Sequence, residues 1–367
     1  MRVLVIGNGK SVFVRDFVEQ MADKMPLSTI DVLTTDDTLI KARVNIIKPK
    51  NRCRIPKLRR FIYLLQYRKL LKGKHYDVAH IHFVDILKVL AIKAIRKSCD
   101  KLIVTVWGSD FYRSSVKLAR LQERVYDRAD YITFATNETL EKFNDYYQDK
   151  YVEKLRICTF GLAPLEYLKK MKLTKEDCRR HFSIPEDAIT VCVGYNAGSW
   201  HRHKEVIRSI ARNKSGLPDN MFLIFPMTYG RDEKYVAEVK EEIRKLGIKN
   251  LVLDNFMTPE ESAMLRMATD VFINVQTTDV LSGSMLEHIY AGSVVVTGDW
   301  LPYGALDEMG IDVYKVSKPD DVGGVLWFMM SNLESWKSNH ASKENVYEFA
   351  SWENNIKSWV RLWRLWK

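Results

Sequence analysis

Two carboxylates eight residues apart are the first candidates for chemistry in this sequence of 367 residues. Asp279 and Glu287 enclose a Ser-Gly-Ser turn, between the strand-like stretch 270–276 and an apolar, helix-like segment. Ser284 and Glu287 have the spacing of a capping box, which would satisfy the free amides at a helix start. That local role explains Glu287 but neither Asp279 nor Gly283, so we treat this turn as a candidate ligand site.

A second candidate is the basic cluster Arg202, His203 and Lys204, which precedes an apolar helical pattern. The start of a helix attracts anions through its free amides and its dipole. A purely structural helix start would sooner carry acidic residues. We therefore favour diphosphate binding here, with a solvated helix end as the alternative.

Other familiar chemistries find little support. The GNGKS turn at 7–11 resembles a phosphate loop, but Leu4 stands where that motif needs a glycine. Its small residues, Gly9 among them, would still let a ligand approach the backbone. The sequence has no Asp-x-Asp motif for a metal and no Gly-x-Ser-x-Gly motif for a nucleophile. His80 and His82 alternate on a strand, where packing is their commoner role.

The elements that must position these residues alternate between strand and helix patterns. Strand-like runs recur through both halves of the chain, which predicts an α/β fold with two doubly wound, Rossmann-like domains. Ligands of such sheets bind beyond the carboxyl ends of the strands. The loops to examine are therefore 7–11, 107–110, 194–204, 227–231 and 279–287, which two such domains would place across one cleft.

The domain boundaries follow from breaks in this pattern. We expect an N-terminal domain over 1–165, a linker over 166–187, and a C-terminal, ligand-binding domain over 188–342. The remaining segment, 343–367, carries a helical stripe with basic neighbours. Crossing back onto the N-terminal domain is the expected role of this helix, and a lipid-headgroup interface is the alternative. The stripe consists of Trp352, Ile356, Trp359, Trp363 and Trp366.

Composition sets further limits. An apolar content of 46% fits packed globular domains, and no run of 18 apolar residues predicts a membrane span. The five cysteines are scattered and form no Cys-x-x-Cys pair, as is usual in the reducing cytoplasm. The net charge of +11 has its source in 41–74, which holds thirteen basic residues and no acidic one. We expect this segment to bind an anionic membrane surface, with a solvated helix face as the alternative; a nucleic-acid partner is not expected.

Five stretches of the chain together resemble the GT-B glycosyltransferases of family 4. They are HYDVAHIHF, LIVTVWGSDFYR, RADYITFATNETLEKF, CRRHFSIPEDAITVCVGYN and DVLSGSMLEHIYAGSVVV. The resemblance covers essentially the whole chain, and the acidic pair is its most specific part. It implies transfer of a sugar from a UDP-, GDP- or dTDP-sugar to a hydroxyl acceptor, with retention of configuration and without a metal or cofactor. An epimerase or phosphorylase of the same fold is the alternative.

The resemblance also implies roles for individual residues. Glu287 matches the acid that binds the donor's ribose, and Asp279 matches the acid beside the sugar, with Asp in place of the usual Glu. Lys204 matches the family's diphosphate-binding lysine, and Arg202 is the substitute candidate for its companion arginine. We expect further donor contacts from residues at the strand ends and the helix start: Gly9, Gly194, Asn196, Thr228, Tyr229, Met257, Ser282, Gly283, Ser284 and Met285.

The acceptor side is less well determined by the resemblance. Trp107 stands where many family members carry a histidine, so the role of that histidine is not carried over. An inverting enzyme would need a base near the acceptor, for which Asp110 and His82 are candidates. Residues 222–243 also resemble bacterial transferases that add 4-acetamido-4,6-dideoxygalactose to a lipid-linked glycan. This implies a lipid-linked acceptor, surface polysaccharide synthesis and a peripheral position at the cytoplasmic face of the membrane.

Overall fold

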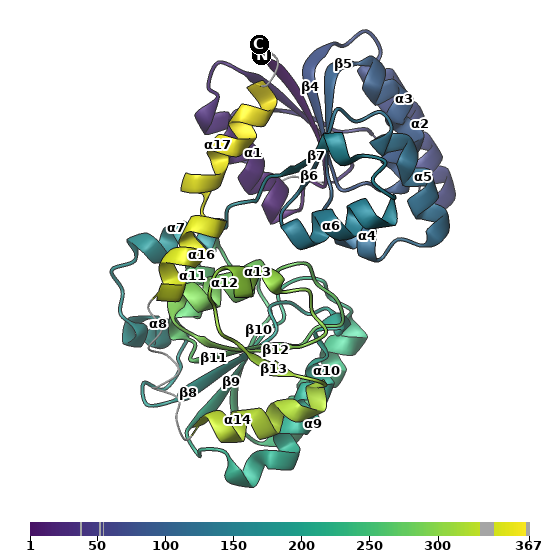
Figure 1. Cartoon of the computed structure of the whole chain (residues 1–367). Coiled ribbons are helices and arrows are strands. Elements are labelled where there is room, and N and C mark those ends of the chain that lie inside the picture. The colour runs from purple at the N-terminus through teal and green to yellow at the C-terminus, as the bar shows by residue number, and fades with distance from the viewer. Residues whose placement is uncertain (37–38, 51–52, 54, 331–340, 365–367) are drawn as a thin grey trace. The chain divides into compact units, whose positions relative to one another are not determined.

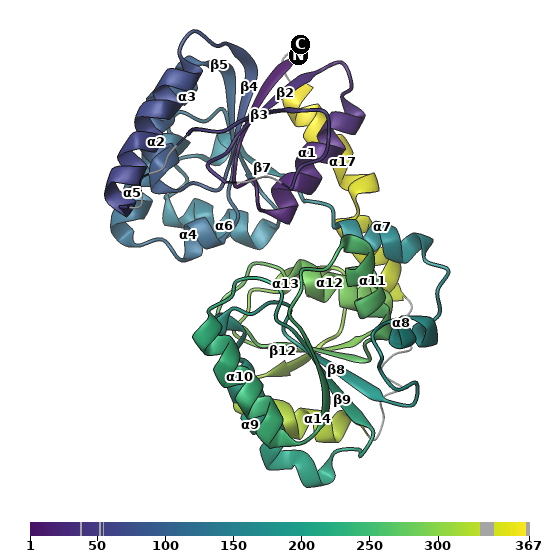
Figure 2. The ribbon, with the colours of Figure 1, turned by 180° about the vertical axis from the view of Figure 1, so that it is seen from behind.

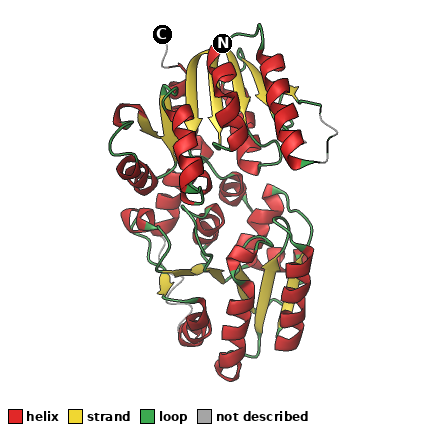
Figure 3. Ribbon diagram, turned by 90° about the vertical axis from the view of Figure 1, so that its right-hand side faces the viewer, coloured by secondary structure: helices red, strands yellow, loops and turns green. Residues whose placement is uncertain are grey.

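The computed structural model describes residues 1–36, 39–50, 53, 55–330 and 341–364, and the chain forms two compact units (Figure 1). The first unit consists of residues 1–161 together with 352–367, and the second of residues 162–351. In each unit, helices flank a parallel sheet (Figure 3).

The sheet of the first unit is entirely parallel, in the order β3-β2-β1-β4-β5-β6-β7. Its central strands are buried on both faces, which is why they are near-continuous apolar runs in the sequence. The strands are β1 (Arg2–Ile6), β2 (Thr29–Leu33), β3 (Asn45–Ile47), β4 (Tyr76–His82), β5 (Cys99–Thr105), β6 (Tyr131–Phe134) and β7 (Leu155–Ile157).

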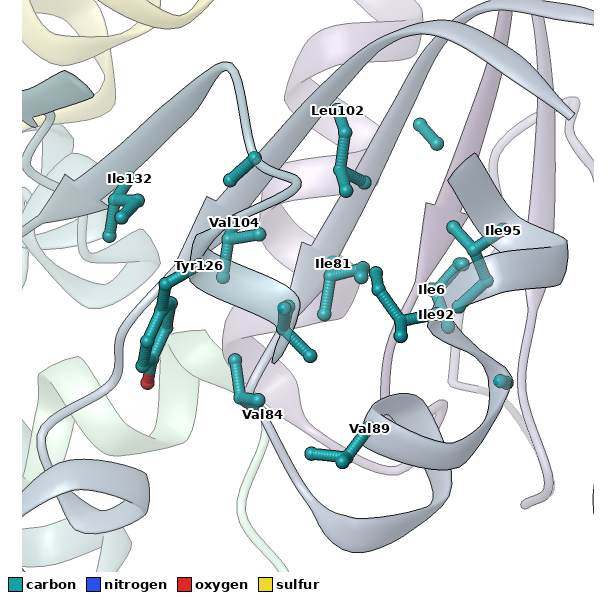
Figure 4. Close-up of a cluster of buried hydrophobic side chains, with 14 of the residues drawn as sticks. Ile6, Ile81, Val84, Val89, Ile92, Ile95, Leu102, Val104, Tyr126 and Ile132 are labelled. Carbon is teal, nitrogen blue, oxygen red and sulfur yellow. The ribbon is translucent and has the colours of Figure 1, made fainter. Parts of the chain in front are cut away.

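Helices cover both faces of this sheet. One face packs against α2, α3, α5 and α6, and Figure 4 shows part of this core around Ile81 and Tyr126. The other face packs against α1 and α17, which lie side by side in Figures 1 and 2. The helices are α1 (Val12–Lys24), α2 (Pro56–Leu71), α3 (Ile86–Lys97), α4 (Ser109–Tyr112), α5 (Val116–Tyr126), α6 (Asn137–Tyr146), the 3₁₀ turn η1 (Val152–Lys154) and α17 (Trp352–Arg364).

Tryptophans dock α17 onto the first unit. The indole N–H of Trp359 donates to the Thr159 carbonyl at 2.9 Å, and that of Trp363 donates to His80 Nδ1 at 3.3 Å. His80 Nε2 lies 2.7 Å from the Thr105 hydroxyl. These two indoles and Trp352 are buried, so a headgroup interface for them is wrong, because they have no surface left for lipid. Trp366 lies outside the described residues.

The C-terminal segment differs from the single helix expected over 343–367. It forms two helices, α16 (Ala341–Ala350) and α17, with Ser351 between them. Only α17 packs in the first unit, whereas α16 belongs to the second, where the Tyr347 hydroxyl donates to Glu166 at 3.0 Å. The predicted stripe starts at Trp352, so it coincides with α17 and does not extend into α16.

The sheet of the second unit is also parallel, in the order β10-β9-β8-β11-β12-β13. This is the Rossmann order, with the chain reversing direction across the sheet between β8 and β11. The strands are β8 (Ile189–Val193), β9 (Met221–Pro226), β10 (Lys249–Leu253), β11 (Val271–Asn274), β12 (Val294–Gly298) and β13 (Tyr314–Val316).

Two helical layers cover the second sheet. One core includes α7, α8, α11, α12, α13 and α16, and the other includes α9, α10 and α14. Thr258 and Glu261 form a capping box at the start of α11. The elements are α7 (Ala163–Lys170), α8 (Lys175–His181), η2 (Ser199–His201), α9 (His203–Asn213), η3 (Lys214–Gly216), α10 (Glu233–Leu246), α11 (Pro259–Ala268), α12 (Gly283–Ala291), α13 (Gly304–Glu308), η4 (Pro319–Asp321), α14 (Val322–Met330) and α16.

Candidate functional site

The switch point of the second sheet brings the predicted donor loops together. The loop after β8 and the loop after β11 leave neighbouring strands at the carboxyl edge, where ligands of such sheets bind. Gly194, which directly follows β8, has a φ of +66°, and a Cβ there would lie 3.0 Å from His203 Nε2. Both the backbone conformation and the space therefore require glycine at this position.

Glu287 is a buried carboxylate near the start of α12. The Nε of Arg266 on α11 donates to its Oε2 at 3.1 Å, and the two residues are only 6% and 7% exposed. Two charges held this far from water need each other, since desolvation of either alone is costly. Glu287 is thus fixed in place as an anion at the edge where a ligand would bind.

The capping interpretation of Glu287 is wrong. The cap of α12 is Ser282, whose hydroxyl accepts the Met285 amide at 3.2 Å, and Ser284 lies inside the first turn. The Ser284 hydroxyl is enclosed and has no hydrogen-bond partner among the described residues. Gly283 begins the helix, and a Cβ there would lie 2.8 Å from a Leu162 methyl group. The amides of Gly283 and Ser284, the first two of α12, have no intrahelical carbonyl to bind, which leaves them suited to an anion.

Asp279 is held by three hydrogen bonds. Its Oδ2 accepts from Gln276 Nε2 at 2.6 Å and from the Tyr303 hydroxyl at 2.7 Å, and its Oδ1 accepts from the Val280 amide at 2.9 Å. Tyr303 lies just before α13, so this carboxylate joins the loops that follow β11 and β12. Its orientation is fixed by side chains that the sequence did not single out.

The basic cluster at the start of α9 is less charged than predicted. His203 is fully buried, and burial lowers its pKa to about 3, so this imidazole is neutral at physiological pH. Lys204 points toward α10, where its ammonium lies 2.7 Å from Glu238 Oε2. Arg202 has a left-handed backbone, with φ at +59°, and its guanidinium lies 5.8 Å from the centre of the Trp300 ring.

Trp300 connects Arg202 to the acidic part of the site. The indole N–H of Trp300 donates to the carbonyl of Gln276 at 2.9 Å, and Gln276 in turn donates to Asp279. Of the two predicted cations, Arg202 therefore lies with the loops of the candidate site, although its Nε is also 3.4 Å from Glu205 Oε1. Lys204 would have to exchange Glu238 for a ligand.

Further polar and aromatic residues lie in the loops at the carboxyl edge of the second sheet. Asn196 is buried and accepts the Gly198 amide at 2.8 Å, and the Ala197 amide donates to the carbonyl of Tyr229 at 2.8 Å. Tyr229 is 44% exposed, and desolvation raises the pKa of its phenol. Thr228 in the same loop and Met257 after β10 are half-buried.

Several participants were missed by sequence reasoning. Arg266, Gln276 and Tyr303 hold the two acids, and nothing in their spacing from those acids marks them. Only Arg266 carried a signal, because an arginine within the apolar helix run AMLRMA has to find a buried partner or an exposed position.

The candidates in the first unit have structural partners. The Gly9 amide donates to the Thr34 hydroxyl at 2.9 Å, so it is already engaged. Asp110 is buried and accepts the amides of Val84 and Trp107, each at 2.8 Å. Burial raises the pKa of Asp110 to about 6. Its carboxylate thus ties the loops after β4 and β5 together.

Neither predicted base fits a direct catalytic role. Both oxygens of Asp110 are engaged by backbone amides and closed off from solvent. His82 is also buried, against Phe17 and His80, and burial lowers its pKa to about 3. A general base must reach its substrate and take up a proton near the working pH. Both residues are enclosed, and the pKa of His82 is also too low for this role.

No metal-binding cluster of three or more His, Cys, Asp or Glu side chains is found within the described part of the chain. None of the described helices is long and apolar enough to cross a membrane.

Known proteins share this architecture. Residues 2–137 match the family model for glycosyl transferase 4-like proteins, and no curated protein matches the chain by sequence. Among solved structures, a glycosyltransferase from Rickettsia africae aligns over 99% of this chain and 98% of its own, with a TM-score of 0.75 and 13% identity. Sucrose-phosphate synthase from Thermosynechococcus elongatus aligns over 100% and 98%, with a TM-score of 0.76 and 13% identity.

A third similar structure is HepE from Anabaena in complex with UDP and glucose, with a TM-score of 0.75, 13% identity and 99% of each chain covered. The chain therefore has the GT-B fold of these glycosyltransferases, and its residues 2–137 match the glycosyl transferase 4-like family model. The predicted fold class is confirmed, and the family resemblance is confirmed for residues 2–137.

Proposed function

We propose that the protein transfers a sugar from a nucleoside-diphosphate sugar to a hydroxyl acceptor and that its second unit binds the donor. The observation that carries this proposal is the buried Glu287, held by Arg266 beside the first-turn amides of α12. A fixed anion suits the hydroxyls of a ribose, and the adjacent helix start suits a diphosphate. The UDP bound in the HepE structure is consistent with such a donor.

Each predicted residue then has a physical role. Glu287 accepts hydrogen bonds from the ribose, and Asp279 lies beside the sugar. Departure of the nucleoside diphosphate builds up negative charge, which the first turn of α12 and Arg202 stabilise electrostatically. Lys204 joins them once the diphosphate competes with Glu238, an exposed pairing that is easily exchanged.

The decisive test is the affinity of folded Glu287→Ala for nucleotides. UDP, GDP and dTDP are titrated calorimetrically into the wild type to find the base it accepts, and the variant is then measured with that nucleotide. We expect at least a tenfold loss, because the ribose loses charge-assisted hydrogen bonds. Glu242→Ala, which removes an exposed partner of Arg208, is the matched control and should bind normally. Wild-type affinity in Glu287→Ala would refute the donor site.

We propose that catalysis is metal-independent and retains configuration. Positive charge for the leaving group comes from the chain itself, through Arg202, Lys204 and the start of α12. Activity should therefore survive EDTA. Loss of turnover in EDTA that added Mg²⁺ or Mn²⁺ restores would contradict this mechanism, and the anomeric configuration of the product, read by NMR, decides retention.

We also propose a lipid-linked acceptor reached from an anionic membrane surface. Helix α2 has two apolar stripes: one packs into the core, and the other, formed by Leu58, Phe61 and Leu65, is exposed, with Phe61 at 56%. Arg59 and Arg60 lie exposed beside it. An exposed apolar stripe with basic neighbours suits a headgroup region with anionic lipid. Residues 51–52 and 54 of the predicted basic segment lie outside the described residues.

Vesicle co-sedimentation tests this surface. The wild type should bind phosphatidylserine-containing vesicles at low salt and less at high salt, because screening weakens the attraction. Arg59→Glu/Arg60→Glu should lose this binding. The control Arg244→Glu/Lys245→Glu makes the same change of charge on α10 and should keep it. A wild type that ignores anionic vesicles at low salt would refute the membrane proposal.

A further inference from the structure

Asp279 is the one predicted acid whose orientation is set by a chain of buried side chains. Tyr303, Gln276 and Asn274 are all almost fully buried. Asn274 donates to Tyr303, and Tyr303 and Gln276 each donate to Asp279. Asn274 is the last residue of β11, Gln276 lies in the loop that follows, and Tyr303 comes from the loop after β12. The chain therefore reaches from the end of a strand to the candidate site.

The direction of each hydrogen bond in this chain is determined. The Tyr303 oxygen lies 2.7 Å from Asp279 Oδ2 and 2.7 Å from Asn274 Nδ2. A carboxylate can only accept, so the single phenolic proton is donated to Asp279. The group on the other side of the phenol must then donate, which fixes the Asn274 amide with its NH₂ toward Tyr303. Burial and the nearby charge of Asp279 raise the pKa of Tyr303 well above its usual range, so the phenol keeps its proton.

Gln276 acts on the same oxygen from a second direction. Its Nε2 donates to Asp279 Oδ2 at 2.6 Å, while its backbone carbonyl accepts the Trp300 indole at 2.9 Å. Two side-chain donors on one carboxylate oxygen set the plane of the carboxylate, and the anchored backbone keeps one of those donors in place. Such a group does not have to be oriented when a ligand arrives, which improves binding and catalysis.

We propose that Tyr303 and Gln276 are positioning residues that orient Asp279 toward the sugar of the donor. They act through Asp279 and do not themselves contact the reacting atoms. This inference rests on the proposed function, since it takes the sugar of a nucleoside-diphosphate sugar as the group that Asp279 recognises. It also bears on the presence of Asp where the family usually has Glu. The shorter Asp279 side chain is held in one orientation by the buried Tyr303 and Gln276.

The test separates recognition of the sugar from recognition of the nucleotide. Calorimetry gives the Kd of UDP-glucose and the Kd of UDP for each variant, or those of GDP-mannose and GDP, or dTDP-glucose and dTDP, if the wild type prefers them. The quantity compared is the ratio of the sugar-nucleotide Kd to the nucleotide Kd. Tyr303→Phe should raise this ratio about tenfold, which is the contribution of one hydrogen bond to a charged group. The nucleotide Kd should change less than about twofold.

The matched control is Tyr347→Phe, which also removes a phenol–carboxylate hydrogen bond, here to Glu166, from a buried tyrosine of the second unit. It should leave the ratio unchanged. Gln276→Met provides a second variant in case Tyr303→Phe fails to fold, and it should raise the ratio in the same direction.

A double-mutant cycle shows whether Tyr303 acts through Asp279. If it does, Tyr303→Phe/Asp279→Asn binds the sugar nucleotide no more weakly than Asp279→Asn alone, because the oriented group is already altered. Additive losses would overturn the inference, as would a Tyr303→Phe ratio equal to that of Tyr347→Phe. A wild type that binds none of these nucleotides would instead refute the proposed function, and the inference with it.

Discussion

The buried pair Arg266–Glu287 allows stability and function to be separated by mutation. Arg266→Met keeps the length of the side chain but leaves Glu287, 7% exposed, without its arginine. Breaking a buried ion pair from one side costs about 3–5 kcal/mol, because one charge stays in a poorly solvated place. We expect the free energy of unfolding of the second unit to fall by about 3 kcal/mol.

The double variant Arg266→Met/Glu287→Leu should behave differently. Replacing both partners of a buried pair by apolar residues is often neutral, so stability should return to within about 1 kcal/mol of the wild type. The double variant should nevertheless bind the nucleotide weakly, since it lacks the carboxylate that binds the ribose. Urea unfolding followed by fluorescence gives the first quantity, and calorimetry with the nucleotide that the wild type prefers gives the second.

Two results would refute this reasoning. A loss of less than about 1 kcal/mol in Arg266→Met would show that water reaches Glu287 and that the pair is not a buried one. Normal nucleotide affinity in the stable double variant would show that Glu287 serves the fold alone.

The remaining predictions concern the fold around the site. Gly323→Ala should lower the free energy of unfolding by about 2 kcal/mol, because a Cβ there would lie 2.2 Å from a backbone carbonyl of α9; Gly324→Ala, where nothing lies within 4 Å, should cost nothing in the same urea titration. Trp359→Ala should cost about 3–5 kcal/mol, whereas Trp327→Ala, 57% exposed, should cost less than about 1 kcal/mol. Asp110 should make unfolding pH-dependent, because its pKa is about 6 in the folded chain and near its usual 3.8 when unfolded. The folded state then favours the protonated form, so stability should fall as pH rises from about 4 to about 6, by up to about 3 kcal/mol, and Asp110→Asn should flatten that dependence in unfolding curves recorded across this range.

The order of elements could be predicted because the relevant patterns are local. Apolar runs of five to seven residues marked β1, β4 and β8, and the alternation with helical patterns was enough for the α/β class. The acidic pair was visible for the same reason, since Asp279 and Glu287 lie on one loop and the helix that follows it. Such short-range patterns of apolar and polar residues depend on the local backbone conformation, so the sequence reveals them directly.

The supporting contacts could not be predicted because they join distant elements. Arg266 reaches Glu287 from the preceding helix, and Tyr303 reaches Asp279 from a loop 24 residues further along. Sequence spacing says nothing about which side chains two packed helices bring together. The cap of α12 was assigned to Ser284 although Ser282 fills it, because two serines two residues apart are equivalent until the backbone shows where the helix begins.

The membership of α17 in the first unit has a consequence for the order in which the protein can form during synthesis. The second unit is one continuous stretch, 162–351, and the Leu162 amide donates to the Ala350 carbonyl at 2.9 Å, so its two ends meet. The first unit, by contrast, needs residues 352–364 to cover the Trp-binding face of its sheet. A ribosome delivers those residues only after the whole second unit has emerged. Of the two units, the first therefore begins translation earlier but is completed later. The face of its sheet around Phe17 and His80 stays uncovered until α17 has been synthesised.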